Sequence, residues 1–530
     1  MPSRLGKATI IVMVGTSVSM ALGFARQAGL AALFGATATT DAYMVAFFIP
    51  NQLQSFLIAG VLTAAFIPNF VELLAKEDTA KSQQLVNTVI NLVLILFILI
   101  TVIGVVGAPW LVGLIAPGFV GDTRELTINL TRIMFPAVIG TGLAGLLGSI
   151  LNSYQHFAVP AFTPAAFSFV FIASLLTLGR TFGIVGVALG ILMASLCQAI
   201  IQLPPLFRAG FRYQPILNLR HPALAKVVKL AMPLFLRLLV VQFYLVVLRI
   251  LASQLAEGSV SAFEYAQRVS LAPAQALGAA IPIVLFPTLS MQAARMESGK
   301  FLSTLSSGIS KLLLLLVPAS VLMMVLGTPL VRLLFQRGAF SAEATSLTAG
   351  PLLYFSLGLF AYPVLWLLNR AFFALQRAVI PLIVVSVCSL LTTGLAVVLA
   401  PYLGVAALAL SYSVSAILQV LALLGAMMRR ASSLEMGLLL GRSSKVATAG
   451  LAMAPVCWLL AHQLGLFRGG LGIGLEILYL AASSLTALMV YALVLLTLRN
   501  EEALSIWSAA VREPAARYIR ALNNVRNSKI

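Results

Sequence analysis

Apolar residues occur in long runs along this chain, and short polar segments separate the runs. Residues 92–106, 312–326 and 477–498 are examples. A run of about 20 residues crosses a hydrocarbon core about 30 Å thick, because a helix rises about 1.5 Å per residue. Backbone groups in lipid must satisfy one another, and runs this long and this rich in leucine predict membrane-spanning helices rather than barrel strands.

The pattern predicts about fourteen spans. Their approximate bounds are 8–33, 41–71, 84–113, 126–152, 161–178, 184–206, 224–254, 259–289, 305–333, 344–369, 378–399, 404–427, 446–464 and 471–498. The first apolar segment is too long for a signal peptide, so we expect a retained helix. Residues 499–530 mix apolar and basic positions and predict a cytoplasmic amphipathic tail that need not span.

An internal repeat relates two parts of the chain at one offset, near 220 residues. The similar pairs are 107–119 with 327–340, Leu151-Asn152 with Leu368-Asn369, and Phe66-Ile-Pro68 with Leu285-Phe-Pro287. A shared offset is typical of a duplicated structural unit.

The repeat predicts an all-α integral membrane protein with two pseudo-symmetric six-helix lobes, residues 1–210 and 220–430. Two C-terminal helices follow in 443–498. Six spans per lobe give both halves the same orientation, and substrate sites of such transporters lie between the halves near the bilayer midplane. Channels and structural proteins are also duplicated, so the repeat alone favours transport without requiring it.

Composition supports the membrane assignment and explains the high charge. The chain is 61% hydrophobic and only 9% charged, whereas soluble domains carry about a quarter charged residues. Its net charge of +19 falls mostly in one set of alternate loops, and the opposite loops hold only Arg124, Arg180, Arg332, Arg337 and Arg468. Basic residues concentrate on the cytoplasmic side of membrane proteins. We therefore expect cytoplasmic termini in a bacterial inner membrane and no nucleic-acid partner.

Motifs for enzymes and cofactors are missing from the sequence. It has no Gly-x-x-x-x-Gly-Lys-Ser/Thr loop for ATP, no zinc-spaced ligand cluster and no nucleophile elbow. The three cysteines fall singly in apolar spans, where they are expected to be small core residues. We expect neither an enzyme nor a bound cofactor or metal.

Charged residues inside the predicted spans are the candidate functional groups. Those placed at membrane depth are Arg26, Arg132, Arg237, Arg249, Arg268, Asp41, Glu264 and Glu476. Each costs about 2.5–3.5 kcal/mol at membrane depth even on lenient insertion scales. Five arginines against three acids favour an anionic substrate, and the guanidinium fork can bind two phosphate oxygens at once.

Arg268 is the strongest candidate because it lies near the midplane of its predicted span. Glu264, Arg268 and Gln275 share one helical face by spacing. Pro273 and Pro282 follow and predict a bend that exposes backbone groups toward a cavity. The alternative is that Glu264 simply neutralises Arg268 as an internal ion pair.

Two further polar positions leave function and structure open. Arg26 lies between Gly23 and Gly29, where it could bind substrate or extend to the outer interface. Asn51 and Gln54 form a polar stripe that predicts either a wet cavity face or helix–helix hydrogen bonds.

The other intramembrane charges have structural alternatives. Asp41 opens its helix, where it could also act as an N-terminal cap or dipole partner. Arg237 and Arg249 are twelve residues apart and point about 120° apart, so both can face one cavity only if the helix bends. The alternative is that Arg249 lies at the interface. Arg132 and Glu476 are expected to be structural or interfacial.

Several ordered motifs resemble the MurJ (MviN) family of lipid II flippases. They are Leu22-Gly-Phe-Ala-Arg26, Phe34-Gly35, Thr40-Asp41-Ala42-Tyr43, Tyr265-Ala-Gln-Arg268, Gln336-Arg-Gly-Ala-Phe340 and Arg370-Ala-Phe-Phe-Ala-Leu375. The resemblance implies the multidrug/oligosaccharidyl-lipid/polysaccharide exporter fold, with two lobes around a cationic cavity. It also implies outward transport of undecaprenyl-diphosphate-linked peptidoglycan precursor by alternating access, with the last two helices forming a groove for the lipid tail.

The resemblance carries the family's cavity arginines onto Arg26 and Arg268, and its helix-opening acid onto Asp41. The chain departs from the family where it has Met20 and Gln54 in place of arginines, and Gln27 and Gln267 in place of acids. The full set of candidate substrate-binding residues is Arg26, Arg268, Asp41, Asn51, Gln54, Gln27, Gln267, Glu264 and Arg237.

The departures from the family pattern leave the head group and the coupling ion open. The alternatives are a flippase for another polyprenyl-linked oligosaccharide, of O-antigen or capsule type, and a non-transporting membrane scaffold. Expected partners are the lipid-linked anionic glycan, membrane lipids and the cell-wall synthesis machinery.

Overall fold

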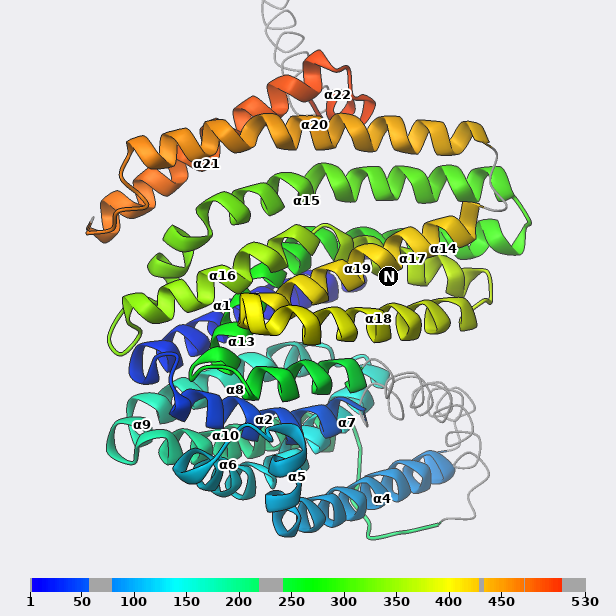
Figure 1. Ribbon diagram of the computed structural model, residues 1–530. Helices are drawn as coiled ribbons and strands as arrows, with labels where there is room; N and C mark the ends of the chain where they lie inside the picture. The colour runs from blue at the N-terminus through cyan, green and yellow to red at the C-terminus, as the bar shows by residue number, and fades with distance from the viewer. Residues whose placement is uncertain (1, 57–78, 219–241, 429–432, 471, 508–530) are drawn as a thin grey trace, which may run out of the picture. The chain divides into compact units, whose positions relative to one another are not determined.

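The computed structural model describes residues 2–56, 79–218, 242–428, 433–470 and 472–507 (Figure 1). These residues are almost entirely helical, and no strand occurs among them. The predictions for 57–71, 224–241, 508–530 and Arg237 therefore lie outside the described residues.

The helices divide between two compact units. Unit 1 comprises Met1–Glu264 and Phe335–Ala344, and unit 2 comprises Tyr265–Leu334 and Thr345–Ile530. The first part of the chain forms α1 (Pro2–Phe34), α2 (Ala38–Phe56), α4 (Thr79–Val106), α5 (Ala108–Ile115), α6 (Gly121–Met134), α7 (Ala137–Ser153), α8 (Ala158–Leu176), α9 (Leu178–Thr181), α10 (Gly183–Ile200), α11 (Leu203–Arg208) and the helix Gln242–Ser253.

The second part begins with α13, which crosses the division between the units. Its helices are α13 (Ser259–Pro273), the π-helical turn η2 (Ala274–Gly278), α14 (Ala280–Ala294), α15 (Ser298–Phe335), α16 (Ala342–Gly358), α17 (Ala361–Ala374), α18 (Val379–Leu403), α19 (Val405–Met428), α20 (Ser433–Gln463), α21 (Ile473–Thr497) and α22 (Glu501–Trp507). The predicted lobe bounds, 1–210 and 220–430, stay a prediction.

Small residues let the helices of unit 1 approach one another. α1 packs on α8, and α10 packs on both α7 and α8. A Cβ added to Gly140 of α7 would lie 2.6 Å from the Ser195 backbone of α10, and one added to Gly190 of α10 would lie 2.5 Å from the Ser174 side chain of α8. Such contacts are typical of membrane helices, where close backbone approach supplies the packing energy.

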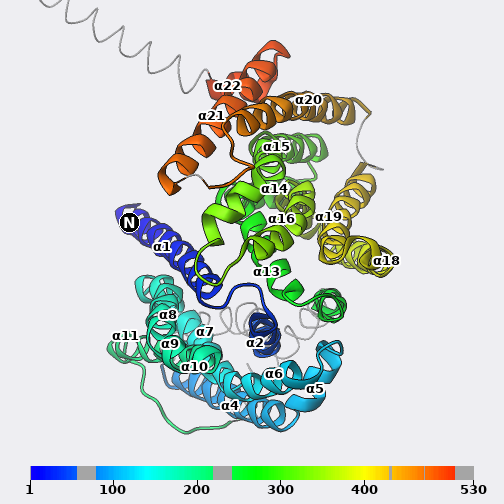
Figure 2. The same ribbon diagram turned by 60° about the vertical axis from the view of Figure 1, so that its left-hand side comes forward.

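In unit 2, the last two long helices, α20 and α21, pack against each other and against α15 (Figures 1 and 2). Apolar residues of α15, α20 and α21 form one buried cluster that includes Leu314, Met453 and Tyr491. The Tyr491 hydroxyl donates to the Leu314 carbonyl at 2.9 Å, which gives this buried polar group a partner. The predicted 443–498 pair is therefore attached to the unit by α15.

Proline bends the eighth predicted span as expected. The segment Ser259–Gly278 meets α14 at an angle of 47°, and η2 lies immediately before the bend. Pro282 lacks the N–H that would bond to the Gly278 carbonyl four residues earlier, and its ring crowds that carbonyl. A Cβ added to Gly278 would lie 2.5 Å from the Pro363 ring of α17, so only glycine fits there.

The prediction of an all-helical membrane protein is confirmed. Ten described helices are long and apolar enough to cross a membrane, or up to twelve if each of two bent pairs is one span. The total of about fourteen stays a prediction, because two predicted spans lie partly outside the described residues.

Candidate functional site

Asp41 connects the start of α2 to the start of α13. Its carboxylate is buried and accepts hydrogen bonds from the backbone N–H groups of Gly258, at 2.8 Å, and Ser261, at 2.7 Å. Unpaired N–H groups and the helix dipole make the first turn of a helix attractive to an anion. Asp41 therefore caps a helix 217 residues away in sequence, in addition to lying in the first turn of its own.

Arg249 is buried and pairs with Glu264, which decides against two alternatives that the sequence left open. Its guanidinium also lies 3.9 Å from the Phe48 ring centroid and donates to the Met44 carbonyl at 3.5 Å. Arg249 is thus not interfacial. Glu264 does not neutralise Arg268, because the tertiary contact with Arg249 takes the carboxylate that helical spacing assigned to Arg268.

The repeated loops make reciprocal contacts with helix ends. The N–H of Gly118 lies 3.4 Å from the Ser253 hydroxyl, and the N–H of Ala339 donates to the Ala32 carbonyl at 2.8 Å. An added Cβ at Gly118 or Gly338 would overlap the carbonyl of Ser253 or Ala32, respectively. The repeat offset of 220 relates Gly118 to Gly338 and brings Ala32 to position 252, next to Ser253.

These contacts join segments from both sequence repeats within unit 1. We call Ala32, Asp41, Gly118, Ser253, Gly258, Ser261, Gly338 and Ala339 the helix-end cluster. Two loop-to-helix contacts related by the repeat and one carboxylate cap hold it together. Each of its contacts has a backbone N–H as the donor, and water can form the same kind of bond with such a group.

Arg26 lies on the aromatic side chains of α8. Its guanidinium is 5.3 Å from the ring centroids of both Phe167 and Phe171, and the residue is half-buried. Stacking on aromatic faces stabilises a cation by about 0.5–2 kcal/mol and fixes the direction of the fork. The following residue, Gln27, is buried. The rings of α8 therefore hold the Arg26 guanidinium in a defined direction, and the next residue is an amide.

Arg268 differs from Arg26 and Arg249 in its exposure to solvent. It is exposed on α13, and the described part of the chain offers it no ion pair or hydrogen bond. Gln267 beside it is half-buried. An exposed guanidinium retains all five N–H donors for a ligand, which is what a phosphate-binding arginine needs.

The remaining predicted residues fall on or near α2. Asn51 is half-buried, while the side chain of Gln54 and all of Arg237 lie outside the described residues. The sequence did not predict one hydrogen bond between helices. The Gln242 side chain donates to the side-chain oxygen of Gln52 in α2 at 2.8 Å. This helix–helix hydrogen bond involves Gln52, the residue between Asn51 and Leu53, and leaves both alternatives for Asn51 and Gln54 open.

Glu476 is structural, as expected, and lies within unit 2. It is buried and forms an ion pair with Arg332 at 3.5 Å, while Arg332 also donates to the Leu466 carbonyl at 2.8 Å. The pair fastens α21 to α15. Arg132 is exposed on α6. No group of three or more His, Cys, Asp or Glu residues among the described ones could hold a metal ion.

Comparisons with known proteins give one consistent family. The family model described as lipid II flippase MurJ matches residues 30–499. The lipid II flippase MurJ of Burkholderia cenocepacia is 30% identical over 429 residues, which cover 79% of this chain and 83% of the relative. The probable lipid II flippase MurJ of Bdellovibrio bacteriovorus is 28% identical over 491 residues, 92% of this chain and 93% of the relative.

Solved structures show the same fold. A lipid II flippase MurJ in an inward closed conformation matches with a TM-score of 0.77 at 23% identity and covers 92% of this chain and 99% of that chain. An inward-facing multidrug resistance MATE family transporter of the MOP superfamily matches with a TM-score of 0.66 at 16% identity. The match covers 79% of this chain and 100% of that chain. The exporter fold that the motifs predicted is therefore confirmed.

Proposed function

The chain belongs to the lipid II flippase MurJ family, and we propose that it moves lipid II from the inner to the outer leaflet by alternating access. The family match over residues 30–499 is the observation that carries this proposal. Lipid II carries undecaprenyl diphosphate, which suits the five arginines of the predicted spans. The chain acts as a transporter and not as an enzyme.

Arg26 and Arg268 bind the diphosphate in this proposal. The exposed and unpaired Arg268 supports it, because its donors are not used by the described residues. The aromatic rings under Arg26 support it as well, because they orient a guanidinium without neutralising it. Asn51, Gln54, Gln27, Gln267 and Arg237 are the further head-group contacts of the proposal.

The helix-end cluster is the closed gate of one state. Asp41 holds the first turn of α13, and Gly118 and Gly338 seat their loops on helix ends. Opening the gate breaks the hydrogen bonds between Asp41 and the N–H groups at the start of α13. Water then hydrates both the carboxylate and the N–H groups. The exchange has a small net cost because each bond is replaced by another. In this proposal Asp41 stabilises the closed state through its bonds to α13, and Glu264 does so through its ion pair with Arg249.

The orientation and the driving force complete the proposal. Both termini lie in the cytoplasm of a multi-pass inner-membrane protein, in keeping with the asymmetry of basic loops. The helices of 443–498 hold the lipid tail, and the tail segment 499–530 stays cytoplasmic. Membrane potential or an ion gradient biases the cycle, because the sequence has no ATP loop.

The substitutions at Gln27 and Gln267 favour one second candidate, a flippase for another polyprenyl-linked oligosaccharide. An amide beside each arginine removes the acid of the family pattern and makes the surroundings of the diphosphate more cationic. The diphosphate site is shared by both candidates, and only the sugar differs.

Complementation separates the candidates. The full chain, expressed in cells depleted of their lipid II flippase, should restore growth, and the same chain should not restore O-antigen export in a strain lacking that flippase. Rescue of O-antigen export alone would favour the second candidate. Normal membrane levels with neither rescue would favour a non-transporting scaffold.

A further inference from the structure

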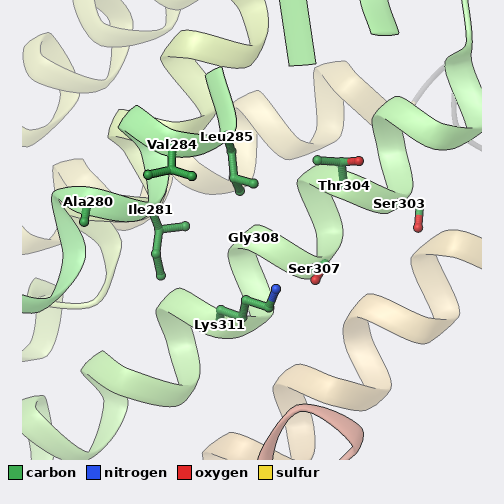
Figure 3. Close-up of a pocket in the computed structure, with 9 residues that line it drawn as sticks. All are labelled: Ala280, Ile281, Val284, Leu285, Ser303, Thr304, Ser307, Gly308 and Lys311. Atoms are coloured by element: carbon green, nitrogen blue, oxygen red, sulfur yellow. The ribbon is translucent and has the colours of Figure 1, made fainter. Parts of the chain in front are cut away.

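A cavity of about 480 Å³ opens between α14 and α15 in unit 2 (Figure 3). Ligand sites of drug-sized molecules fall in the range of about 300–1,000 Å³. Ile281, Val284 and Leu285 of α14 form its apolar side. Thr304, Ser307 and Lys311 of α15 form a polar side at helical spacing. The cavity thus has two chemically different walls.

Lys311 lies in the first part of the predicted span 305–333, directly before its continuous apolar run, and we infer that it lies where the hydrocarbon core ends. The apolar run 312–326 begins at the next residue, and α15 continues to Phe335. The 24 helical steps from Lys311 to Phe335 rise about 36 Å, slightly more than a hydrocarbon core of about 30 Å. With the Phe335 end at one interface, the Lys311 ammonium lies among the phosphates of the other.

The charge of the cavity is not neutralised by its own helices. Glu297 is the single acid in residues 265–334, and it pairs with Lys300 at 3.3 Å. Within the described residues, Lys311 has no ion pair and is exposed. The ammonium therefore keeps its three donors for an anion.

The hydroxyl groups of Thr304 and Ser307 are also available to donate hydrogen bonds. The Thr304 oxygen accepts a hydrogen bond from the Gln292 amide at 3.0 Å, so its own proton is left to donate. Ser307 has no hydrogen-bond partner in the part of the chain that the structure describes. Figure 3 shows the Lys311 amine rising toward Gly308, on the α15 wall that faces Ile281 and Leu285.

We propose that this cavity binds the phosphate of an anionic phospholipid of the leaflet that faces the basic loops. Lys311, Thr304 and Ser307 donate to the phosphate, and the α14 side chains contact the first acyl carbons. An aqueous anion would gain nothing from Val284, which is 70% exposed. A lysine that merely extends to the interface would need neither the hydroxyl groups nor a cavity. The lipid thus stabilises the contact between α14 and α15.

Lipid titration of the purified full chain tests the proposal. Delipidated protein is titrated with phosphatidylglycerol, and bound lipid is counted by native mass spectrometry. We expect Lys311→Gln to weaken the first-bound phosphatidylglycerol about fivefold, as loss of one cation near a membrane surface does. Lys311→Arg should keep most of the affinity. Ser307→Leu, which fills the cavity, should weaken binding while leaving the charge unchanged.

Lys300→Gln is the matched control, because it removes a lysine of the same helix outside the cavity and should leave phosphatidylglycerol binding unchanged. Phosphatidylcholine should bind more weakly and respond little to Lys311→Gln. Equal phosphatidylglycerol binding by wild type, Lys311→Gln and Ser307→Leu would overturn the proposal. Displacement of phosphatidylglycerol by equimolar undecaprenyl diphosphate, with a larger loss in Lys311→Gln, would assign the cavity to a polyprenyl diphosphate instead. Thermal unfolding verifies that each variant is folded.

Discussion

Arg249 and Arg268 are nineteen residues apart in the sequence, yet their surroundings differ in every respect that matters for a ligand. Arg249 is buried over Phe48 and paired with Glu264. Arg268 is exposed and has no ion pair among the described residues. An arginine with a complete set of partners fixes a conformation, whereas one with unused donors is available to an anion. The comparison therefore supports the proposal that Arg268 binds substrate, and it gives Arg249 a structural part in holding its helix to α13.

The largest expected effect is the loss of transport in Arg268→Ala. Truncating one partner of a charged, hydrogen-bonded pair costs about 2–5 kcal/mol, so lipid II translocation should fall by about 30-fold or more. Lysine at this position should rescue only part of the activity, because it keeps the charge but not the fork. Translocation by reconstituted protein measures the effect. Unchanged thermal unfolding is the control, and wild-type transport by Arg268→Ala would refute the role.

Arg249→Ala should act on stability instead. It leaves the Glu264 carboxylate largely buried without its partner, which costs about 3–5 kcal/mol. Unfolding in mixed micelles by a denaturing detergent measures the change. The double variant Arg249→Met with Glu264→Leu should recover most of the stability, because an apolar pair of similar volume needs no charge compensation. If Arg249→Ala were as stable as wild type, the ion pair would not be what holds the helix Gln242–Ser253 to α13.

Alanine at the two repeat-related glycines should weaken the helix-end cluster in the same direction. Overpacking against a backbone carbonyl costs about 1–3 kcal/mol. Gly338→Ala should cost about 1 kcal/mol more than Gly118→Ala, because only Gly338 has a positive φ, of 61°. Maleimide labelling of a cysteine introduced at the buried Ala252, next to Ser253 and in a cysteine-free background, reports the opening. Opposite effects of the two variants would contradict the reciprocal arrangement.

Asp41→Ala should open the cluster by the smallest amount. Loss of a helix N-cap costs about 0.5–2 kcal/mol, and here two N–H groups of α13 lose their acceptor. Asp41→Asn retains one acceptor oxygen and should have about half the effect. The same labelling of a cysteine at position 252 is the measurement. Labelling rates that do not rise in Asp41→Ala would exclude a capping role.

Much of the fold could be predicted because its causes are local. Long apolar runs determine the spans, and Pro273 and Pro282 predict the bend that the structure places after η2. The repeat was visible as a shared offset, and the glycines it relates lie in equivalent loop contacts. Family motifs pointed to the exporter fold, which the comparisons confirm.

The partners of the charged groups could not be predicted, because they depend on tertiary packing. An i, i+4 pair such as Glu264 with Arg268 is worth only about 0.3–0.5 kcal/mol, so a buried arginine from another helix easily replaces it. Asp41 similarly caps a helix that spacing could not identify. Lys311 was not among the candidate residues that the sequence singled out. Its position directly before an apolar run was the signal that it lies at headgroup level.

The most direct test is head-group accessibility in vesicles that hold lipid II in the inner leaflet and the purified chain in the membrane. An impermeant enzyme added outside reports each head group that reaches the outer leaflet. We predict rapid exposure with wild type, exposure reduced at least about 30-fold with Arg268→Ala, and substantial exposure with the Arg249→Met, Glu264→Leu pair. Equal exposure with wild type and Arg268→Ala, or none above protein-free vesicles with wild type, would contradict the account.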